Sequence, residues 1–420
     1  PGGGLTGLRV EGRSGRVRGM GGEAAALVEA ARQRVCDRVD ELADVLVATS
    51  HAIHAEPELA FEEHRAHELL TEVLADNGVD VIRSAYDLDT AFEGSAGTEG
   101  PVVAVLCEYD ALPGIGHACG HNVIATAGLG AGLAAAAVAD ELGGRVRILG
   151  TPAEEGGGGK VLMMNRGAFQ DVDAAMMVHP ADADLETITS LAIQQARVTY
   201  HGLAAHAAAA PERGRNALDA AVLGYVNVAA LRQHIAPDER IHGIITDGGD
   251  KANIVPRRAA ATWYVRSPSL TRLEMLKPRL EACLEAGTAA AGCTMDLNWI
   301  EPGYHEVFDN RSLLERYSAN AATLGRTVHP TTQHQVAGSS DMGNVSQLVP
   351  AIHPMIKVAP LGTAIHTEAF AAFAAEEEAD RAVLDGAKAM AMTVVDCWTD
   401  PSVLEAAREQ MKVARDVRAE

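Results

Sequence analysis

Two loops in the first half of the chain gather residue types that bind metal ions or move protons. The first, residues 108–122, offers a carboxylate, a thiol and two imidazoles within 12 residues, at Asp110, Cys119, His117 and His121. Thiolate and imidazole groups suit zinc and other borderline-soft divalent ions. A glycine-rich turn with a buried cysteine has the same composition, so this loop alone leaves a metal site and a structural turn open.

The second loop, residues 151–160, places Glu154 and Glu155 side by side before four consecutive glycines. Adjacent carboxylates can divide the work of hydrolysis, because one ligates a metal ion while the other takes a proton from water. A solvated acidic turn is the alternative interpretation. A phosphate-binding loop is excluded, because its pattern requires Gly in place of Glu154 and Ser or Thr in place of Val161.

Three further histidines stand where a site could form. His179 follows an apolar stretch, and His366 lies within residues 362–368. Each of these two, taken alone, is more often structural than a ligand. His206 lies in a different part of the chain, so it reaches the same site only through domain closure or from a partner subunit. The sequence has neither a His-Glu-x-x-His helix nor a Gly-x-Ser-x-Gly turn, which argues against thermolysin-type and serine-hydrolase chemistry.

The elements around these loops alternate between strands and helices. Apolar spacing predicts strands at 101–109, 145–150 and 174–178, and helices at 23–54, 62–77 and 122–142. This alternation predicts an α/β fold with a helix-covered, mostly parallel sheet. Such sheets place their sites beyond the carboxyl ends of the strands, which is where both loops and His179 occur.

The alternation of strands and helices changes after about residue 190 and resumes later in the chain. The spacing predicts strands at 196–201, 241–245, 259–266 and 295–299, and helices at 214–235 and 271–291. Two helices on one four-stranded sheet form an α+β unit. This unit is an insertion, because α/β elements resume after it: a helix at 310–324, a strand-like segment at 351–358 and a closing helix at 376–398. We therefore expect a disordered head at 1–20, a catalytic metal-binding domain at 21–191 and 303–420, and an inserted lid or dimerisation domain at 192–302.

Composition and net charge exclude some classes of binding partner. The chain has 420 residues and a formal charge of −22, which is the wrong sign for a protein that binds nucleic acid or anionic lipid. The longest uncharged, mostly apolar run, 123–139, has 17 residues of mainly Ala and Gly, so we expect a buried helix rather than a membrane span. Six scattered cysteines and the lack of a visible signal peptide favour a reducing, cytoplasmic location.

Taken together and in order, the motifs of this chain resemble a known family. The resemblance runs from about residue 25 to the C-terminus, and its segments include Glu108-Tyr-Asp-Ala-Leu-Pro113, His117-Ala-Cys-Gly-His-Asn122, Thr151-Pro-Ala-Glu-Glu155, Asn253-Ile-Val-Pro256 and Ser339-Ser-Asp-Met-Gly-Asn344. They are similar to the two-metal metallopeptidase family M20, and within it to the amidohydrolase branch of aminobenzoyl-glutamate hydrolases, indole-acetyl-amino-acid hydrolases and aminoacylase-like enzymes. The resemblance implies a phosphorylase/hydrolase-like catalytic domain.

The resemblance also implies a set of site residues. Two divalent metal ions would be held by five ligands, which are Cys119, His121, Glu155, His179 and His366. Glu154 would be the general base and acid, and His206 would come from the lid, of the same or the other subunit, to polarise the scissile carbonyl. Asn253 and Arg266 would hold the substrate's carbonyl or carboxylate, with a sheet-surface arginine in a salt bridge as the alternative for Arg266. Zinc suits the Cys and His ligands best, with manganese and cobalt as alternatives.

These expectations describe a metal-dependent amidohydrolase. Its substrate would be an N-acyl or N-aroyl amino acid or a dipeptide-like amide, and the enzyme would be a homodimer or a higher homo-oligomer. A hydrolytic aryl-amine deaminase on the same two-metal site is one alternative, and a non-catalytic metal-binding oligomer is another. Asn122 departs from many relatives in this branch, which have Asp after Cys-Gly-His, and its role stays open.

Overall fold

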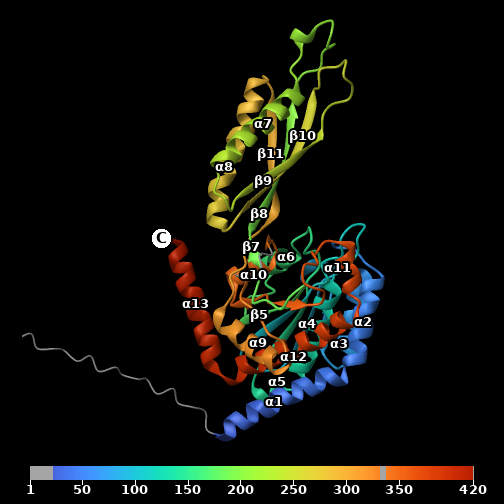
Figure 1. Cartoon of the computed structure of the whole chain (residues 1–420), viewed down its shortest axis with the longest axis vertical. Helices are drawn as coiled ribbons and strands as arrows, with labels where there is room; N and C mark the ends of the chain where they lie inside the picture. The colour runs from blue at the N-terminus through green and yellow to red at the C-terminus, as the bar shows by residue number, and fades with distance from the viewer. Residues whose placement is uncertain (1–21, 332–336, 420) are drawn as a thin grey trace, which may run out of the picture.

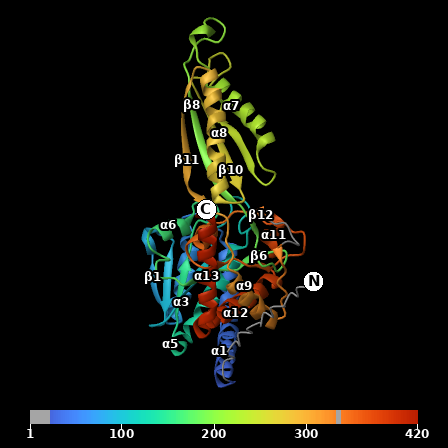
Figure 2. The same ribbon diagram turned by 90° about the vertical axis from the view of Figure 1, so that its left-hand side faces the viewer.

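The computed structural model describes residues 22–331 and 337–419, so the disordered head predicted at 1–20 lies outside the described residues. The chain forms two bodies, each built on its own sheet (Figure 1; Figure 2). We call residues 192–304 the inserted unit and the remaining described residues the main unit. The division into domains that the sequence predicts, with boundaries at 191/192 and 302/303, stays a prediction.

The main unit is organised around a six-stranded sheet in the order β1-β2-β4-β3-β5-β13. Its strands are β1 (Asp80–Arg83), β2 (Phe92–Ala96), β3 (Val102–Cys107), β4 (Arg145–Gly150), β5 (Ala174–Met176) and β13 (Ala351–Ile352). The ladders from β4 to β13 are parallel, and β1 and β2 run antiparallel at one edge. The predicted α/β fold with a mostly parallel sheet is confirmed.

Helices cover both faces of this sheet. They are α1 (Gly22–Glu41), α2 (Ala43–Ala55), α3 (His64–Asp76), α4 (His121–Ala136), α5 (Ala139–Leu142), α6 (Gly159–Asn165), α9 (Arg311–Thr323), α10 (Met342–Leu348), α11 (Glu368–Phe373), α12 (Glu377–Thr399) and α13 (Pro401–Ala419). Val103 and Val105 of β3 face one hydrophobic core, which includes α4 and α12, and Ala104 and Leu106 face a second core with α6 and α10. β3 is therefore buried on both faces, which explains its continuous apolar sequence.

Helix α4 lies between the sheet and α12 and is buried along nearly its whole length. Its small residues allow this close packing. A Cβ atom at Gly128 would lie 2.4 Å from the carbonyl oxygen of Leu106, and one at Gly132 would lie 2.4 Å from the side chain of Ile148. Most of the apolar run at 123–139 is thus a buried helix. Among the described helices, none combines the length and the apolar character of a bilayer span.

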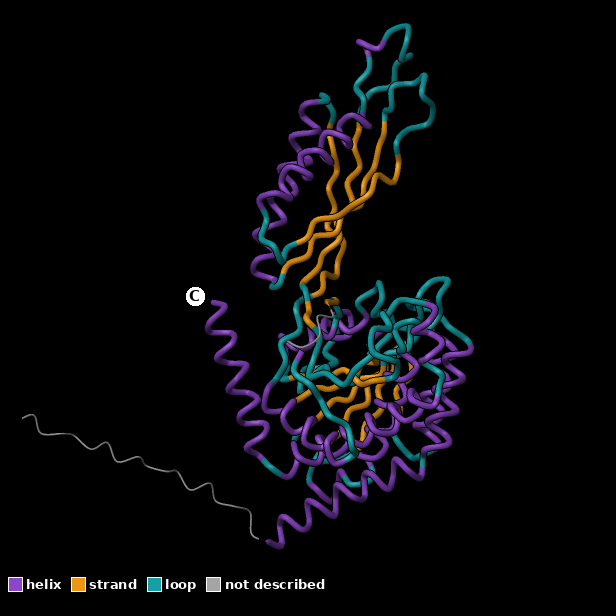
Figure 3. The backbone as a smooth tube through the Cα atoms, viewed as in Figure 1, coloured by secondary structure: helices purple, strands orange, loops and turns teal. Residues whose placement is uncertain are grey.

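The inserted unit is a four-stranded antiparallel sheet in the order β11-β8-β10-β9, with two helices on one face (Figure 3). Its elements are β8 (Ala192–His201), α7 (Ala217–Leu231), β9 (Arg240–Asp247), β10 (Arg258–Ser267), α8 (Leu270–Ala290) and β11 (Thr294–Tyr304). Tyr200, Trp263 and leucines of α8 fill the core between the sheet and the helices. Among the described strands, β9 and β11 are the two edges of this sheet.

Two short parallel ladders complete the structure near the junction of the units. They pair β7 (Thr189–Ser190) with β12 (Ala337–Gly338), and β6 (His179–Ala181) with β14 (Met355–Lys357). The chain enters the inserted unit after Leu191 and leaves it after Tyr304. Val307 N donates a hydrogen bond to Ser190 Oγ at 3.0 Å, so the entering and leaving segments are joined directly.

Three predicted elements are each divided in two in the structure. The helix expected at 23–54 is two helices, α1 and α2, which are separated at Leu42. The helix expected at 122–142 divides into α4 and α5. The strand expected at 351–358 is split into β13 and β14, which belong to different sheets, because Pro354 between them has no backbone N–H to continue one ladder.

Candidate active site

The five side chains that the sequence nominates as metal ligands come from five separate positions in the fold. Cys119 precedes α4, His121 begins α4, Glu155 follows β4, His179 begins β6 and His366 precedes α11. Their donor atoms, with those of Glu154, form three overlapping groups, and within each group all atoms lie within 4.8 Å of one another. The structure therefore brings all five ligand candidates together.

Cys119 and Glu155 link these groups. Cys119 Sγ lies 3.4 Å from His179 Nε2, and Glu155 Oε1 lies 3.3 Å from His366 Nε2 and 3.8 Å from His121 Nε2. Cys119 belongs to one group with two histidines and to another with Glu155 and His366. Overlapping sets of donors around shared residues suit a pair of ions rather than a single one.

The ring of His121 is held so that one nitrogen faces the cluster. Its Nδ1 donates to Asp110 Oδ1 at 3.0 Å, and the other oxygen of Asp110 accepts from the backbone N–H of Glu155 at 2.9 Å. The Nδ1 of His179 donates in the same way to the carbonyl oxygen of Pro180 at 2.8 Å. Hydrogen bonds of this kind fix the orientation and tautomer of ligating histidines. Asp110 thus positions two of the ligand candidates.

Backbone conformation orients other side chains of the cluster. Ala153, directly before Glu154, and His366 have positive φ angles of 59° and 61°, which persist in non-glycine residues only where the surroundings fix them. The N–H of Ala153 donates to Glu63 Oε1 at 2.8 Å. Glu63 is fully buried and also accepts a hydrogen bond from Thr90 Oγ1. The loop that carries Glu154 is therefore fixed by a buried carboxylate from the start of α3.

The unpaired atoms and charges of the cluster fit a cation. Within the described ranges, His121 Nε2 and Glu155 Oε1 are buried without a hydrogen-bond partner. Burial raises the pKa of the Cys119 thiol well above its usual value, and the negative charge of Glu155 raises it further. A thiolate, three imidazoles and a carboxylate match the ligand preferences of zinc and similar divalent ions. The residues present therefore suit divalent metal ions.

Glu154 lies beside the ligand candidates and is 7% exposed. Burial raises the pKa of its carboxyl well above the usual value, and the negative charges of Glu108 and Glu155 raise it further. Tyr304 of β11 donates its phenolic O–H to the carbonyl oxygen of Glu154 at 2.6 Å. A carboxyl in this environment can hold a proton next to the ligands, which is what a general acid and base needs.

A buried charged cluster that sequence reasoning missed adjoins the ligands. Lys160 Nζ donates to Asp341 Oδ1 at 2.6 Å and contacts Glu108 Oε1, and all three side chains are at most 1% exposed. The second oxygen of Glu108 lies 3.6 Å from His121 Nε2. Glu108 and Asp341 both lie in motifs that carry the family resemblance, but no local pattern pairs them with Lys160.

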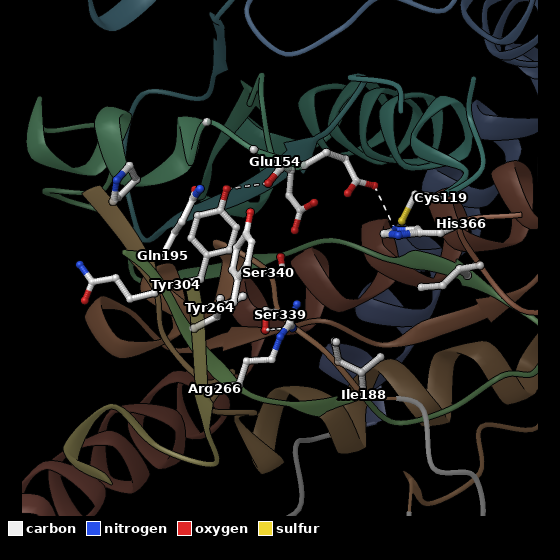
Figure 4. A pocket seen from close by; sticks show the side chains of 18 of the residues that line it. Cys119, Glu154, Ile188, Gln195, Tyr264, Arg266, Tyr304, Ser339, Ser340 and His366 are labelled. Atoms are coloured by element: carbon white, nitrogen blue, oxygen red, sulfur yellow. Dashed lines mark hydrogen bonds and ion pairs between the residues drawn. The ribbon is translucent and has the colours of Figure 1, made fainter. Parts of the chain in front are cut away.

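A pocket of about 590 Å³ lies between the two units, with the ligands at one end (Figure 4). Arg266 of β10 lines it, and its Nη1 donates to Ser339 Oγ at 3.2 Å. Among the described residues, no carboxylate forms an ion pair with Arg266, so the salt bridge considered as an alternative is not observed there. Burial lowers the pKa of this guanidinium from its ordinary value. A partly buried guanidinium without an anion suits a carboxylate of the substrate.

His206 and Asn253 do not line this pocket within one chain. They lie in the loops after β8 and before β10, at the end of the sheet opposite to the pocket residues Gln195 and Arg266. Both are exposed and close together, because Ala207 N donates to the carbonyl oxygen of Asn253 at 3.0 Å. Neither residue joins the cluster in this arrangement.

Asn122 joins helices rather than ligands. Its Nδ2 donates to Ser50 Oγ of α2 at 2.9 Å and to the carbonyl oxygen of Ala374 at 2.8 Å. The side chain is fully buried. Asn122 therefore ties the start of α4 to α2 and to the segment between α11 and α12.

Comparison with known proteins places this geometry in a family. The family described as Peptidase family M20/M25/M40 matches residues 87–396. The chain belongs to this family. It is 40% identical over 410 residues to Xaa-Arg dipeptidase of Mus musculus, which covers 93% of this chain and 94% of that protein. It is 28% identical over 465 residues to a p-aminobenzoyl-glutamate hydrolase polypeptide of Escherichia coli, and the match covers 93% of this chain and 94% of that protein.

Solved structures of the family share its fold. A dinuclear metal-binding peptidase of the M20 family from Bacillus subtilis superposes with a TM-score of 0.63 at 20% identity, covering 88% of this chain and 99% of that one. An aminobenzoyl-glutamate utilization protein from Klebsiella pneumoniae superposes with a TM-score of 0.65 at 21% identity, covering 83% of this chain and 97% of that one. The chain is a metal-dependent amidohydrolase, which confirms the predicted class of enzyme.

Proposed function

We propose that this amidohydrolase cleaves dipeptides with arginine at the carboxyl-terminal position. The observation that carries the proposal is the 40% identity, over 93% of the chain, to a protein named Xaa-Arg dipeptidase. Identity to the p-aminobenzoyl-glutamate hydrolase polypeptide is lower, at 28%. Arg266 supports the proposal, because a dipeptide presents a terminal carboxylate that a guanidinium can bind through two parallel hydrogen bonds.

The side chains around the pocket have separate roles in this reaction. Two divalent ions, when bound by the five ligand candidates, would polarise the amide carbonyl and make the attacking water more acidic. Glu154 accepts the proton of the attacking water at its carboxylate and then passes it to the leaving nitrogen. Arg266 binds the terminal carboxylate and so orients the amide toward Glu154. Tyr304 supports this geometry, because it holds the backbone of Glu154.

Zinc is the working ion in this proposal, because a thiolate and three imidazoles dominate the ligand set. Manganese and cobalt are the alternatives. The thiol of Cys119 has to stay reduced to serve as a ligand, which supports a cytoplasmic location.

A homodimer would complete the site. Residues 192–302 would act as a lid and dimerisation domain, and His206 of one subunit would reach the pocket of the other to polarise the scissile carbonyl. Asn253 lies beside His206 and would enter with it. Strand β9 offers an edge for pairing, and its Ile244 is 65% exposed, while Val226 on α7 is 57% exposed. An edge strand and exposed apolar side chains suit contact with a second copy.

Mixed dimers test this delivery between subunits. His206→Ala and His366→Ala are each expected to be inactive as pure proteins. A mixed dimer contains one pocket with intact ligands that receives an intact His206, so mixing the two variants should restore activity. If the mixture stays inactive while exchange of subunits is verified, His206 does not act across the dimer.

The substrate is tested with protein loaded with zinc, manganese or cobalt. We expect kcat/KM to be highest for alanyl-arginine in a comparison with alanyl-glutamate and p-aminobenzoyl-glutamate. Glu154→Gln should keep its metal content by elemental analysis but lose turnover. A preference for p-aminobenzoyl-glutamate would refute the proposed substrate, and full activity of Glu154→Gln would refute its role as the base.

A further inference from the structure

The pocket contains one carboxylate that the ligand cluster and the proposed catalytic steps leave unused. Among the described residues, three acidic side chains line the pocket, and they are Glu154, Glu155 and Glu301. The first two belong to the ligand cluster. Glu301 comes from β11 in the inserted unit, and on the pocket wall it joins Arg266, which comes from β10 in the same sheet.

Glu301 accepts hydrogen bonds from two neutral donors. Its Oε1 accepts from Gln194 Nε2 at 2.6 Å, and its Oε2 accepts from the backbone N–H of Gly303 at 3.3 Å. Gln194 is 5% exposed, so its amide is a fixed support. Within the described ranges, Glu301 forms no ion pair with a lysine, an arginine or a histidine. The carboxylate is therefore positioned by these two donors, without a cation of its own among the described residues.

The segment that carries Glu301 is packed against the catalytic loop. Pro302 packs so closely on Gly158 that a Cβ atom at Gly158 would lie 2.3 Å from its ring. Tyr304 donates to the carbonyl oxygen of Glu154, as described above. These two contacts fix the end of β11 beside the reacting groups. Glu301 thus stands at a defined place on the wall of the pocket, not on a free loop.

Glu301 and Arg266 lie on opposite sides of the central strand β8. Arg266 pairs with Ile193 of β8 on one side, and Tyr304 of β11 pairs with Ile193 on the other. Because neighbouring strands are about 4.8 Å apart, the two outer strands are separated by roughly 10 Å. Arg266 and Glu301 therefore come from the two strands that flank β8, and both line the same pocket.

We infer that Glu301 is the binding site for the cationic side chain of the substrate's carboxyl-terminal residue, arginine or lysine. Arg266 binds the carboxylate of this residue, and Glu301 binds its guanidinium or ammonium group. This inference rests on the proposed function and adds the residue that selects a basic substrate. A hydrogen bond to a charged group contributes to binding, but Glu301 is exposed at the rim of the pocket, which weakens the contribution through solvent screening.

The test compares two dipeptides that differ only in charge. Alanyl-citrulline has nearly the shape of alanyl-arginine, but its ureido group is neutral. For the unmodified enzyme we expect kcat/KM to be about tenfold higher with alanyl-arginine, which is the lower range for a hydrogen bond to a charged group. Glu301→Gln should reduce this ratio to near one by lowering the value for alanyl-arginine alone. Glu285→Gln, on the exposed face of α8, is the matched control and should keep the ratio.

The outcomes separate this inference from the proposed function. If the unmodified enzyme prefers alanyl-arginine and Glu301→Gln keeps that preference, Glu301 is not the selecting residue although the proposed function stands. If Glu301→Gln loses activity equally on both dipeptides, its role is structural and the inference is overturned. If the unmodified enzyme cleaves neither dipeptide, or both equally well, the proposed substrate fails and the inference fails with it.

Discussion

The buried lysine next to the ligand cluster offers a sharp test of how this fold is stabilised. Lys160 stands between Glu108 and Asp341, and none of the three side chains is more than 1% exposed. Lys160→Met keeps much of the length of the side chain but removes its charge. Two buried carboxylates then lose the lysine cation that both contact.

The size of the effect follows from this burial. Breaking a buried ion pair costs about 3–5 kcal/mol, because the remaining charge is left unpaired in a poorly solvated site. An exposed pair contributes only about 0–1 kcal/mol. Lys388 with Asp40 is a suitable comparison, because their side chains are 15% and 57% exposed. We expect Lys160→Met to lower the melting temperature by roughly 6–20 °C, taking about 2–4 °C per kcal/mol for a unit of 150–250 residues.

Thermal unfolding of metal-free protein, in the presence of a chelator, measures this difference without a contribution from metal binding. Lys388→Met is the control and should melt close to the unmodified protein. Lys160→Met combined with Asp341→Asn should recover part of the loss, since one of the two unpaired charges is then removed. If Lys160→Met and Lys388→Met melt at the same temperature, the buried cluster does not stabilise the fold as argued.

Three further predictions concern other parts of the main unit. Burial raises the pKa of Glu63 from 4.5 to about 7. The folded state therefore binds this proton more tightly than the unfolded state does, and this difference stabilises the fold. The stabilisation is complete below pH 4.5 and is lost as the pH rises through 7. Melting curves at pH 5 and pH 8 should differ less for Glu63→Gln, and an unchanged difference would exclude Glu63 as the source. Gly150→Ala would place a Cβ atom 2.1 Å from the ring of Phe92, so we expect about 1–3 kcal/mol of destabilisation in urea, and an unchanged midpoint would contradict this packing. His366→Ala should lose bound metal, and full metal content by elemental analysis would remove His366 from the ligand set.

Apolar spacing was sufficient to predict most of the fold. The predicted strand at 145–150 is β4 with the same bounds, and the helices of the inserted unit were placed within a few residues. The exposed edge strand β1 was missed, because its sequence Asp-Val-Ile-Arg lacks a clear alternation. The interruption at Leu42 was missed because no glycine or proline marks it. The C-terminal helix α13 was not predicted either, although its sequence is rich in helix-forming residues.

The candidate site was predictable where residue type alone indicates chemistry. Cys119 and His121 were candidates by residue type, but their loop also fitted a structural turn, and the family resemblance implied their role as ligands. Lys160 could not, because its partner Asp341 is 181 positions away and only the fold brings them together. Asp110 was noticed as a possible ligand, but its actual hydrogen bond to His121 depends on the side-chain orientation. Glu301 gave no signal, because one glutamate among many acquires meaning only from the pocket that surrounds it.

The path of the chain through the two bodies has a consequence for how such enzymes can be altered. All five ligand candidates belong to the main unit, whereas Arg266 and Glu301 belong to one continuous stretch, residues 192–304, that enters and leaves at adjacent points. The reacting groups and the recognition groups are thus encoded in separate parts of the gene. We expect that replacing this stretch with that of a relative would exchange substrate preference while leaving the ligand set untouched. New specificities can therefore arise by recombination at two junctions, without rebuilding the chemistry.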